Sequence, residues 1–125
     1  MSAALKRIAF AGIGNMGWPM AANLVKAGFE VTVCDVAPGR AASFATETGA
    51  KAAATPAEAA NGADCVVIIV PTSKQVGEAV EAMLPSLKPG MLVIDMTSGQ
   101  PGRTREIAAM LEGHGVAMID CPVSG

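Results

Sequence analysis

The chain has 125 residues, which fits one domain, and 51% of them are hydrophobic, so a sizeable core is available. The formal net charge is −2 with acids and bases dispersed, which argues against nucleic acid as the main partner, because a phosphate backbone needs clustered Lys and Arg. The sequence has no membrane span, signal peptide or metal-ligating cluster, and its three scattered cysteines lack C-x-x-C spacing. We therefore expect a cytoplasmic protein without a membrane, nucleic-acid or metal partner.

Apolar runs alternate with helical segments along almost the whole chain. The first half predicts, in chain order, a strand over Lys6–Ala11, a helix over Met16–Ala27, a strand over Glu30–Asp35, a helix over Pro38–Thr48, a minor strand over Ala52–Ala54 and a helix over Pro56–Ala60 capped by Thr55. The second half predicts a strand over Asp64–Val70, a helix over Ser73–Leu84, a connection over 85–90, a strand over Met91–Asp95, a helix over Gln100–Glu112 and a strand over Val116–Asp120.

Continuous apolar strands joined by helices are typical of a parallel sheet covered on both faces. The predicted fold class is therefore α/β, a doubly wound parallel sheet of the Rossmann type. We expect residues 1–125 to form one dinucleotide-binding domain.

A glycine-rich turn, Gly-Ile-Gly-Asn-Met-Gly over residues 12–17, lies between the first predicted strand and the first predicted helix. Gly12 permits the tight turn, Gly14 lets the backbone approach a pyrophosphate, and Gly17 allows close packing of helix on strand. The N–H groups and partial positive charge of the helix N-terminus attract an anion. The turn therefore predicts a dinucleotide site; the alternative is a glycine turn without a cofactor.

Asp35 closes the second predicted strand, roughly 20 residues beyond the glycines, where the NAD fingerprint has an acid. A carboxylate there accepts hydrogen bonds from the hydroxyls of the adenosine ribose and repels a 2′-phosphate, so the sequence favours NAD over NADP. Arg40 follows shortly after and complicates this choice if it offers a cation to the same ribose. The alternative for Arg40 is a solvated helix residue.

Hydroxyl residues follow two later strands, at the edge where the carboxyl ends of parallel strands line a ligand crevice. Thr72 and Ser73 follow one strand, and the alternative for Ser73 is that it only caps the next helix. Thr97 and Ser98 follow the next strand and offer hydrogen bonds to a cofactor or substrate; their alternative is a turn and helix cap.

No residue is predicted to be catalytic. Hydride transfer to or from an alcohol needs a general acid or base near the reacting oxygen, and the sequence places no lysine, histidine or tyrosine for this role. His114 lies between two glycines in a surface-like turn, and no base is placed beside Cys121. Cys34 and Cys65 lie in apolar runs that are typical of buried thiols.

The combined segments resemble the N-terminal half of the β-hydroxyacid dehydrogenases, a family that includes 3-hydroxyisobutyrate dehydrogenase, tartronate semialdehyde reductase and 6-phosphogluconate dehydrogenase. The residues that carry the resemblance are Phe10–Leu24, Pro71–Ser73, Asp95–Ser98 and Asp120–Gly125. The match is nearer to 3-hydroxyisobutyrate dehydrogenase than to the phosphogluconate enzymes. Met96 and Cys121 depart from the family's pattern.

The resemblance implies an NAD-dependent oxidoreductase that interconverts a small 3-hydroxy acid and its semialdehyde. It implies cofactor contacts from Gly12, Ile13, Gly14, Asn15, Met16, Gly17, Asp35, Val70, Pro71, Thr72, Gln75 and Ser98, and substrate contacts from Ser124 and Gly125. The resemblance also implies that the catalytic lysine and its neighbouring asparagine lie on a later helix, and that an all-helical C-terminal domain completes the substrate pocket. We therefore expect the catalytic lysine beyond Gly125 and this chain alone to be inactive.

Two alternatives to an NAD-dependent dehydrogenase stay open: an NADP-dependent reductase of the same family, and a non-catalytic nucleotide-binding module. Because a partial chain exposes apolar surface, we also expect association into a homo-oligomer.

Overall fold

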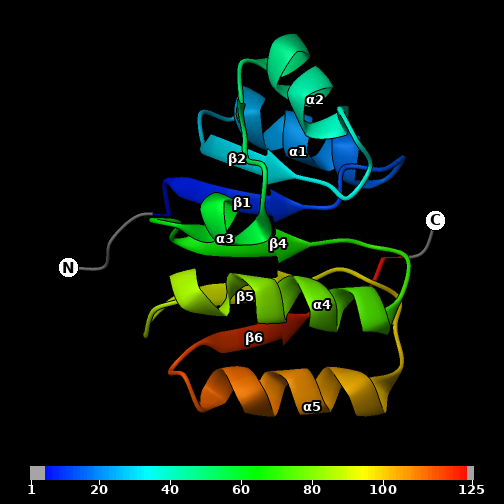
Figure 1. The fold of residues 1–125 in the computed structure, drawn as a ribbon, viewed down its shortest axis with the longest axis vertical. Helices are drawn as coiled ribbons and strands as arrows, with labels where there is room; N and C mark the ends of the chain where they lie inside the picture. The colour runs from blue at the N-terminus through cyan, green and yellow to red at the C-terminus, as the bar shows by residue number, and fades with distance from the viewer. Residues whose placement is uncertain (1–4, 124–125) are drawn as a thin grey trace.

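Six parallel strands form one sheet in residues 5–123, the part of the chain that the computed structural model describes (Figure 1). The strands are β1 Arg7–Ala11, β2 Glu30–Cys34, β3 Lys51–Ala52, β4 Cys65–Ile68, β5 Leu92–Asp95 and β6 Ala117–Asp120, in the spatial order β3-β2-β1-β4-β5-β6. The helices are α1 Gly17–Lys26, α2 Arg40–Thr48, α3 Pro56–Ala60, α4 Ser73–Met83 and α5 Pro101–Glu112, and a 3₁₀ turn, η1, covers Leu84–Ser86. The predicted doubly wound α/β fold is confirmed.

Each face of the sheet has its own hydrophobic core, because successive strand residues point to opposite faces. In β1, Ile8 and Phe10 pack with α1 and α2, whereas Ala9 and Ala11 pack with α3, α4 and α5. Figure 1 shows α3 and α4 in front of the sheet and α1 behind β2, with α2 at the top of the view and α5 at the bottom beside β6.

The end of the sheet at β5 and β6 is less covered on the side of α1 and α2. Leu92 and Ile94 of β5 are only half-buried there, and the Ile119 side chain of β6 is 46% exposed. This end of the sheet therefore presents apolar side chains to solvent. No helix within residues 5–123 has the length and apolar character needed to cross a membrane.

A carboxylate clamps the start of the central strand. Asp64 Oδ2 accepts hydrogen bonds from the backbone N–H groups of Lys6 and Arg7, each over 2.9 Å. These bonds, that of Arg7 foremost, lower the pKa of the Asp64 carboxyl, because they stabilise its ionised form. The clamp fixes the register of β1 beside β4.

The observed elements are shorter at their ends than the pattern predicts. The strand predicted over Asp64–Val70 ends at Ile68, because the Val70 N–H leaves the sheet and donates to the Thr97 side chain. The minor strand lies at Lys51–Ala52 and not at Ala52–Ala54. The segment after α4 continues as η1, where an extended connection was expected.

Candidate cofactor site

The glycine turn lies between β1 and α1. Its first and third glycines, Gly12 and Gly17, are required because a side chain at either position would clash with the backbone of the chain itself. Gly12 has φ +96°, and a Cβ there would lie 1.9 Å from the Ile69 carbonyl oxygen. A Cβ on Gly17 would lie 2.0 Å from the Gly12 carbonyl oxygen. Both positions therefore exclude any side chain, as close packing of helix on strand requires.

Gly14 is different, because no atom of the described chain lies within 4 Å of where its Cβ would be. Its φ is also outside the left-handed region that favours glycine. Packing within the chain therefore gives no reason for a glycine here. The open space in front of Gly14 fits the close approach of a cofactor pyrophosphate.

The N-terminus of α1 is open to an anion. The helix has no side-chain cap within the described residues and no acidic residue in its first turn. Asn15 is exposed and the Met16 side chain is 41% exposed, so both flank the opening. First-turn N–H groups without a cap, together with the helix dipole, favour a phosphate.

Asp35 lies at the end of β2, where it was predicted, and it contacts the glycine turn, which was not predicted; its contact with a ribose stays a prediction. Its two carboxylate oxygens accept hydrogen bonds from the backbone N–H groups of Ile13 and Ala37, each over 2.8 Å. Asp35 therefore braces the turn and remains half-exposed. Behind it, burial chiefly and the Asp35 charge secondarily raise the pKa of the Cys34 thiol to about 11, so this buried thiol stays protonated at neutral pH.

Arg40 contacts the same turn from the first residue of α2, so the alternative of a solvated helix residue is wrong. Its Nε donates a hydrogen bond to the Ile13 carbonyl oxygen, and its guanidinium carbon lies 5.2 Å from the centre of the Trp18 ring. Trp18 is held in turn by an edge-on contact with Phe44, with ring centres 5.0 Å apart. A fixed cation therefore lies beside the turn that Asp35 braces.

The loops after β4 and β5 are joined through Thr97. The Thr97 N–H donates to Asp95 Oδ1 over 2.9 Å, and Thr97 Oγ1 accepts from the Val70 N–H over 3.1 Å. Asp95 and Thr97 are each only 2% exposed. The expectation that Thr97 offers its hydroxyl to a ligand is therefore wrong, because that hydroxyl is buried and engaged within the chain.

The Asp95 carboxyl is raised in pKa, chiefly by burial and further by the charge of Asp120, its register partner on β6. The hydrogen bonds from Thr97 act in the opposite direction. We did not identify Asp95 from the sequence as an internal hydrogen-bond acceptor. The signal that pointed to it is its position directly after the apolar run Met91–Ile94.

Thr72, and not Ser73, caps α4. Thr72 Oγ1 accepts from the Gln75 N–H, and the Gln75 side chain accepts from the Thr72 N–H, which together form a capping box. Ser73 is buried, and its Oγ accepts from the Gln100 N–H over 2.7 Å. A Cβ on Gly99 would lie 2.1 Å from that Oγ, so the two helix starts meet closely here.

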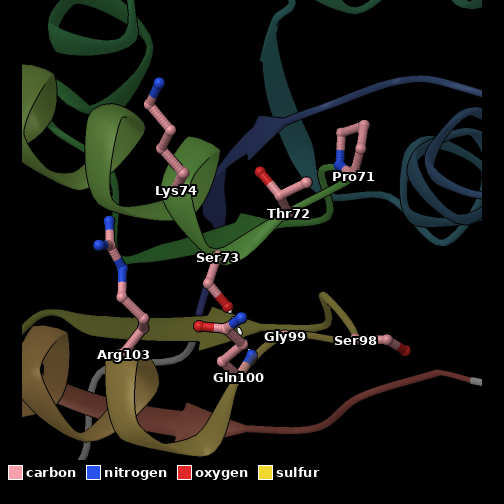
Figure 2. Close-up of a pocket in the computed structure, with 8 residues that line it drawn as sticks. All are labelled: Pro71, Thr72, Ser73, Lys74, Ser98, Gly99, Gln100 and Arg103. Atoms are coloured by element: carbon pink, nitrogen blue, oxygen red, sulfur yellow. Dashed lines mark hydrogen bonds between the residues drawn. The ribbon is translucent and has the colours of Figure 1, made fainter.

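A hollow of about 410 Å³ lies between the starts of α4 and α5 (Figure 2). It is lined by Pro71, Thr72, Ser73, Lys74, Ser98, Gly99, Gln100 and Arg103. Figure 2 shows Lys74 and Arg103 on one side of the joined Ser73 and Gln100, and Pro71 and Ser98 on the other. Three of the residues expected at a cofactor therefore line one hollow at the C-terminal edge of the sheet.

The structure brings most of the predicted residues to this one edge. Val70 packs against the glycine turn, since its Cγ1 would lie 3.0 Å from a Cβ on Gly12. The Ser98 hydroxyl donates to the Val123 carbonyl over 2.9 Å. The predicted substrate residues Ser124 and Gly125 lie outside the described residues.

A family model described as the NAD-binding domain of 6-phosphogluconate dehydrogenase matches residues 7–125. The chain belongs to this family of NAD-binding domains. The resemblance to the β-hydroxyacid dehydrogenases is thereby confirmed at the level of the domain.

The relatives of this NAD-binding domain are longer proteins. A solved structure of 3-hydroxyisobutyrate dehydrogenase from Mycobacterium tuberculosis with L-serine superposes with a TM-score of 0.90 and 40% identity, over 98% of this chain and 42% of that one. An NAD-dependent L-serine dehydrogenase from Pseudomonas aeruginosa is 39% identical over 97% of this chain and 41% of its own length. The mitochondrial 3-hydroxyisobutyrate dehydrogenase of Mus musculus is 37% identical over 94% and 36%. The chain thus spans 36–41% of the length of these curated relatives.

Proposed function

We propose that this domain binds NAD along the C-terminal edge of its sheet and serves an oxidoreductase that acts on a small 3-hydroxy acid. The observation that carries the proposal is the uncapped glycine turn, whose middle glycine faces open space while its outer glycines are packed. In this arrangement the N–H groups at the start of α1 hold the pyrophosphate, and Asp35 lies toward the adenosine ribose.

The nicotinamide half of the cofactor extends toward the loops after β4 and β5. A dinucleotide lies across the point where the strand order reverses, which is between β1 and β4 in this sheet. Since Asp35 is at the end of β2, the other half of the cofactor passes Val70, Pro71 and Ser98. Bound NAD supplies the hydride-accepting carbon, and the residues of this chain bind and orient it.

The substrate class is proposed from the names of the relatives. One relative is named for 3-hydroxyisobutyrate and another for L-serine, and both compounds are 3-hydroxy acids. Ser124 and Gly125, together with residues beyond this chain, would hold the carboxylate. We assign no general acid or base within residues 1–125, so we propose that the purified chain has no turnover, and measurable turnover would contradict this.

NAD is the proposed cofactor, and Arg40 gives NADP acceptance a specific physical basis. Asp35 places a negative charge where a 2′-phosphate would lie, whereas Arg40 provides a fixed cation beside the same turn. Both Asp35 oxygens accept backbone hydrogen bonds, which hold the carboxylate in place. In the dinucleotide fingerprint the acid at this position contacts the ribose directly, so we give Asp35 more weight than Arg40.

Titration with NADH and NADPH tests this proposal. We expect NADH to bind at least about tenfold more tightly, since a fixed like charge opposes the phosphate. Asp35→Asn removes the charge and keeps one acceptor, enough for the Ile13 N–H but not also for the Ala37 N–H, and should narrow the difference between the two affinities. Asp35→Ala removes both acceptors and should weaken the binding of both cofactors. Arg40→Ala should weaken NADPH more than NADH. Equal affinities of the wild-type chain for the two cofactors would contradict the proposed preference.

The cytoplasmic location and the homo-oligomeric state of the protein stay predictions. The described cysteines are free, with Cys34 and Cys65 buried, which suits the proposed reducing cytoplasm. The apolar side chains at the β5 and β6 end, with Ile119 foremost, support the proposed homo-oligomer.

A further inference from the structure

Two hydrogen bonds in series link the buried Asp95 to Val70 at the protein surface. The Asp95 carboxylate fixes the main chain of Thr97, and the Thr97 hydroxyl then fixes the N–H of Val70. Asp95 and Thr97 are buried, but Val70 is half-buried and the next residue, Pro71, is exposed. The chain of contacts therefore begins inside the protein and ends at the wall of the proposed cofactor site.

The Val70 N–H does not bond to a neighbouring strand, and the Thr97 hydroxyl is its hydrogen-bond acceptor. The preceding N–H, that of Ile69, still pairs with the Ala11 carbonyl, but β4 has already ended at Ile68. A backbone donor left without an acceptor costs free energy, so the loop would shift to satisfy it. Thr97 thus decides where the segment Val70–Pro71 lies.

A second, separate contact protects the rest of the fold. Ser73 Oγ accepts from the Gln100 N–H, so the starts of α4 and α5 stay joined when the Thr97 hydroxyl is lost. The capping box of Thr72 and Gln75 also holds the first turn of α4. The Thr97 hydroxyl also hydrogen-bonds the Asp95 side chain, so its loss affects the turn from Asp95 to Thr97 as well as Val70–Pro71, but not the joined starts of α4 and α5.

We propose that Thr97 is a positioning residue for the nicotinamide half of the cofactor, acting through Val70. The inference rests on the proposed function, in which that half passes the loops after β4 and β5. Thr97 touches no ligand in this account. It sets the wall against which the nicotinamide riboside packs. The hydrogen bonds that hold the turn at Gly12–Gly17, from the Ile13 N–H to Asp35 and from Arg40 to the Ile13 carbonyl, do not involve Val70.

The test compares NAD⁺ with ADP on the 125-residue chain by calorimetry. ADP keeps the adenosine and the pyrophosphate but lacks the nicotinamide riboside, so it reports on the glycine turn alone. Thr97→Val keeps the shape of the side chain and removes the hydroxyl. We expect it to raise the Kd for NAD⁺ about fivefold, as for the loss of one hydrogen bond, while the Kd for ADP stays within about twofold.

Three further variants sharpen the result. Thr97→Ser keeps the hydroxyl and should restore the wild-type Kd for NAD⁺. Thr97→Ala also removes the hydroxyl but, unlike Thr97→Val, places no methyl group where the hydroxyl was, and it should show the same selective loss. Thr46→Val is the matched control, because the Thr46 hydroxyl bonds only the Ala42 carbonyl in α2, and it should change neither Kd.

The outcomes separate the two proposals. Equal weakening of NAD⁺ and ADP, or no weakening of either, in Thr97→Val and Thr97→Ala would overturn the positioning role. Failure of the wild-type chain to bind either ligand would overturn the proposed function, and the positioning role with it.

Discussion

Gly14 differs from the two glycines that flank it in what surrounds it. A side chain on Gly12 or Gly17 would meet backbone oxygen atoms at 1.9 and 2.0 Å, whereas one on Gly14 would meet nothing within 4 Å. The outer glycines are therefore required by the fold. Of these three glycines, only Gly14 has no reason within the chain to be a glycine, which supports the proposed approach of a cofactor at this position.

Gly14→Ala should separate binding from stability. We expect the free energy of unfolding to change by less than about 0.5 kcal/mol, because the new methyl group contacts no protein atom. NAD⁺ affinity should fall about tenfold or more, because that methyl group fills the space of the pyrophosphate. Calorimetry and urea unfolding measure the two effects.

Two other glycines provide the controls. Gly17→Ala should prevent stable folding, because its Cβ would meet a backbone oxygen that cannot move away. Gly102→Ala, in α5 and equally without neighbours within 4 Å, should leave NAD⁺ affinity unchanged and raise the free energy of unfolding by about 0.5–1 kcal/mol, because alanine loses less backbone entropy in a helix. Loss of NAD⁺ binding in Gly102→Ala, or retained binding in Gly14→Ala, would contradict the assignment.

Individual site residues were predictable where a local pattern defines their place. Asp35 follows from its spacing to the glycines and its position at a strand end. Arg40 and Trp18 were not predictable as partners, because their contact arises only when α1 and α2 pack side by side. The buried role of Thr97 likewise depends on which loop lies beside it.

At the scale of elements, helix starts are fixed by single side chains. Thr55 was predicted to cap α3, and it does so by accepting from the Glu58 N–H. For α4, two adjacent hydroxyl residues follow β4, and the alternative that Ser73 caps the helix is wrong because Thr72 does so. The deciding signal was in the sequence, since Thr72 has a Gln at the third helix position and Ser73 does not complete that pattern.

The order of strands and helices was predictable, and their ends were less so. Apolar runs bounded by glycines give the order directly. The end of β4 depends on a side chain from another loop, Thr97, which no local pattern contains. The length of η1 depends in the same way on tertiary packing, because the Ser86 hydroxyl donates to the Ala57 carbonyl of α3.

The clamp at the start of β1 predicts a pH dependence of stability. The pKa of Asp64 is lowered in the folded chain, so the unfolded chain binds the proton more readily. The contribution of Asp64 is therefore complete above the unfolded pKa of about 3.9 and is lost as the pH falls through the folded pKa. Asp64→Asn should be less stable than the wild type at pH 7, and the two should converge in acid.

Urea unfolding between neutral and acidic pH checks this expectation. Glu81→Gln, which removes an exposed carboxyl from α4, is the control for the loss of one negative charge. Stability curves of Asp64→Asn and wild type that run parallel over the whole pH range would disprove the role of the clamp.

At the scale of the whole molecule, the sheet divides the hydrophobic interior in two. Phe44 belongs to the core with α1 and α2, whereas Val76 and Val80 belong to the core with α3, α4 and α5. Phe44→Leu and Val80→Ala should each destabilise by about 1–3 kcal/mol. Because they share no neighbour, their effects should add within about 0.5 kcal/mol.

The matched pair lies within one core. Val76→Ala and Val80→Ala remove neighbouring methyl groups from the same face of α4, so we expect their combined effect to depart from the sum. Urea unfolding of the three single variants and the two double variants tests both expectations. Strong coupling between Phe44 and Val80 would show that the two cores are mechanically linked through the sheet.

The division of the hydrophobic interior into two cores also affects how the sequence of this domain can evolve. A substitution under α4 needs compensation only from residues on its own side of the backbone, and the glycine turn with its brace and its cation is held from the other side by α1 and α2. Val70 packs with the core of α3, α4 and α5 and also against Gly12, so the two sides meet at this residue. A lineage that keeps Val70 can therefore alter α4 and α5 while the glycine turn keeps its shape, which under the proposed function gives the nicotinamide new neighbours.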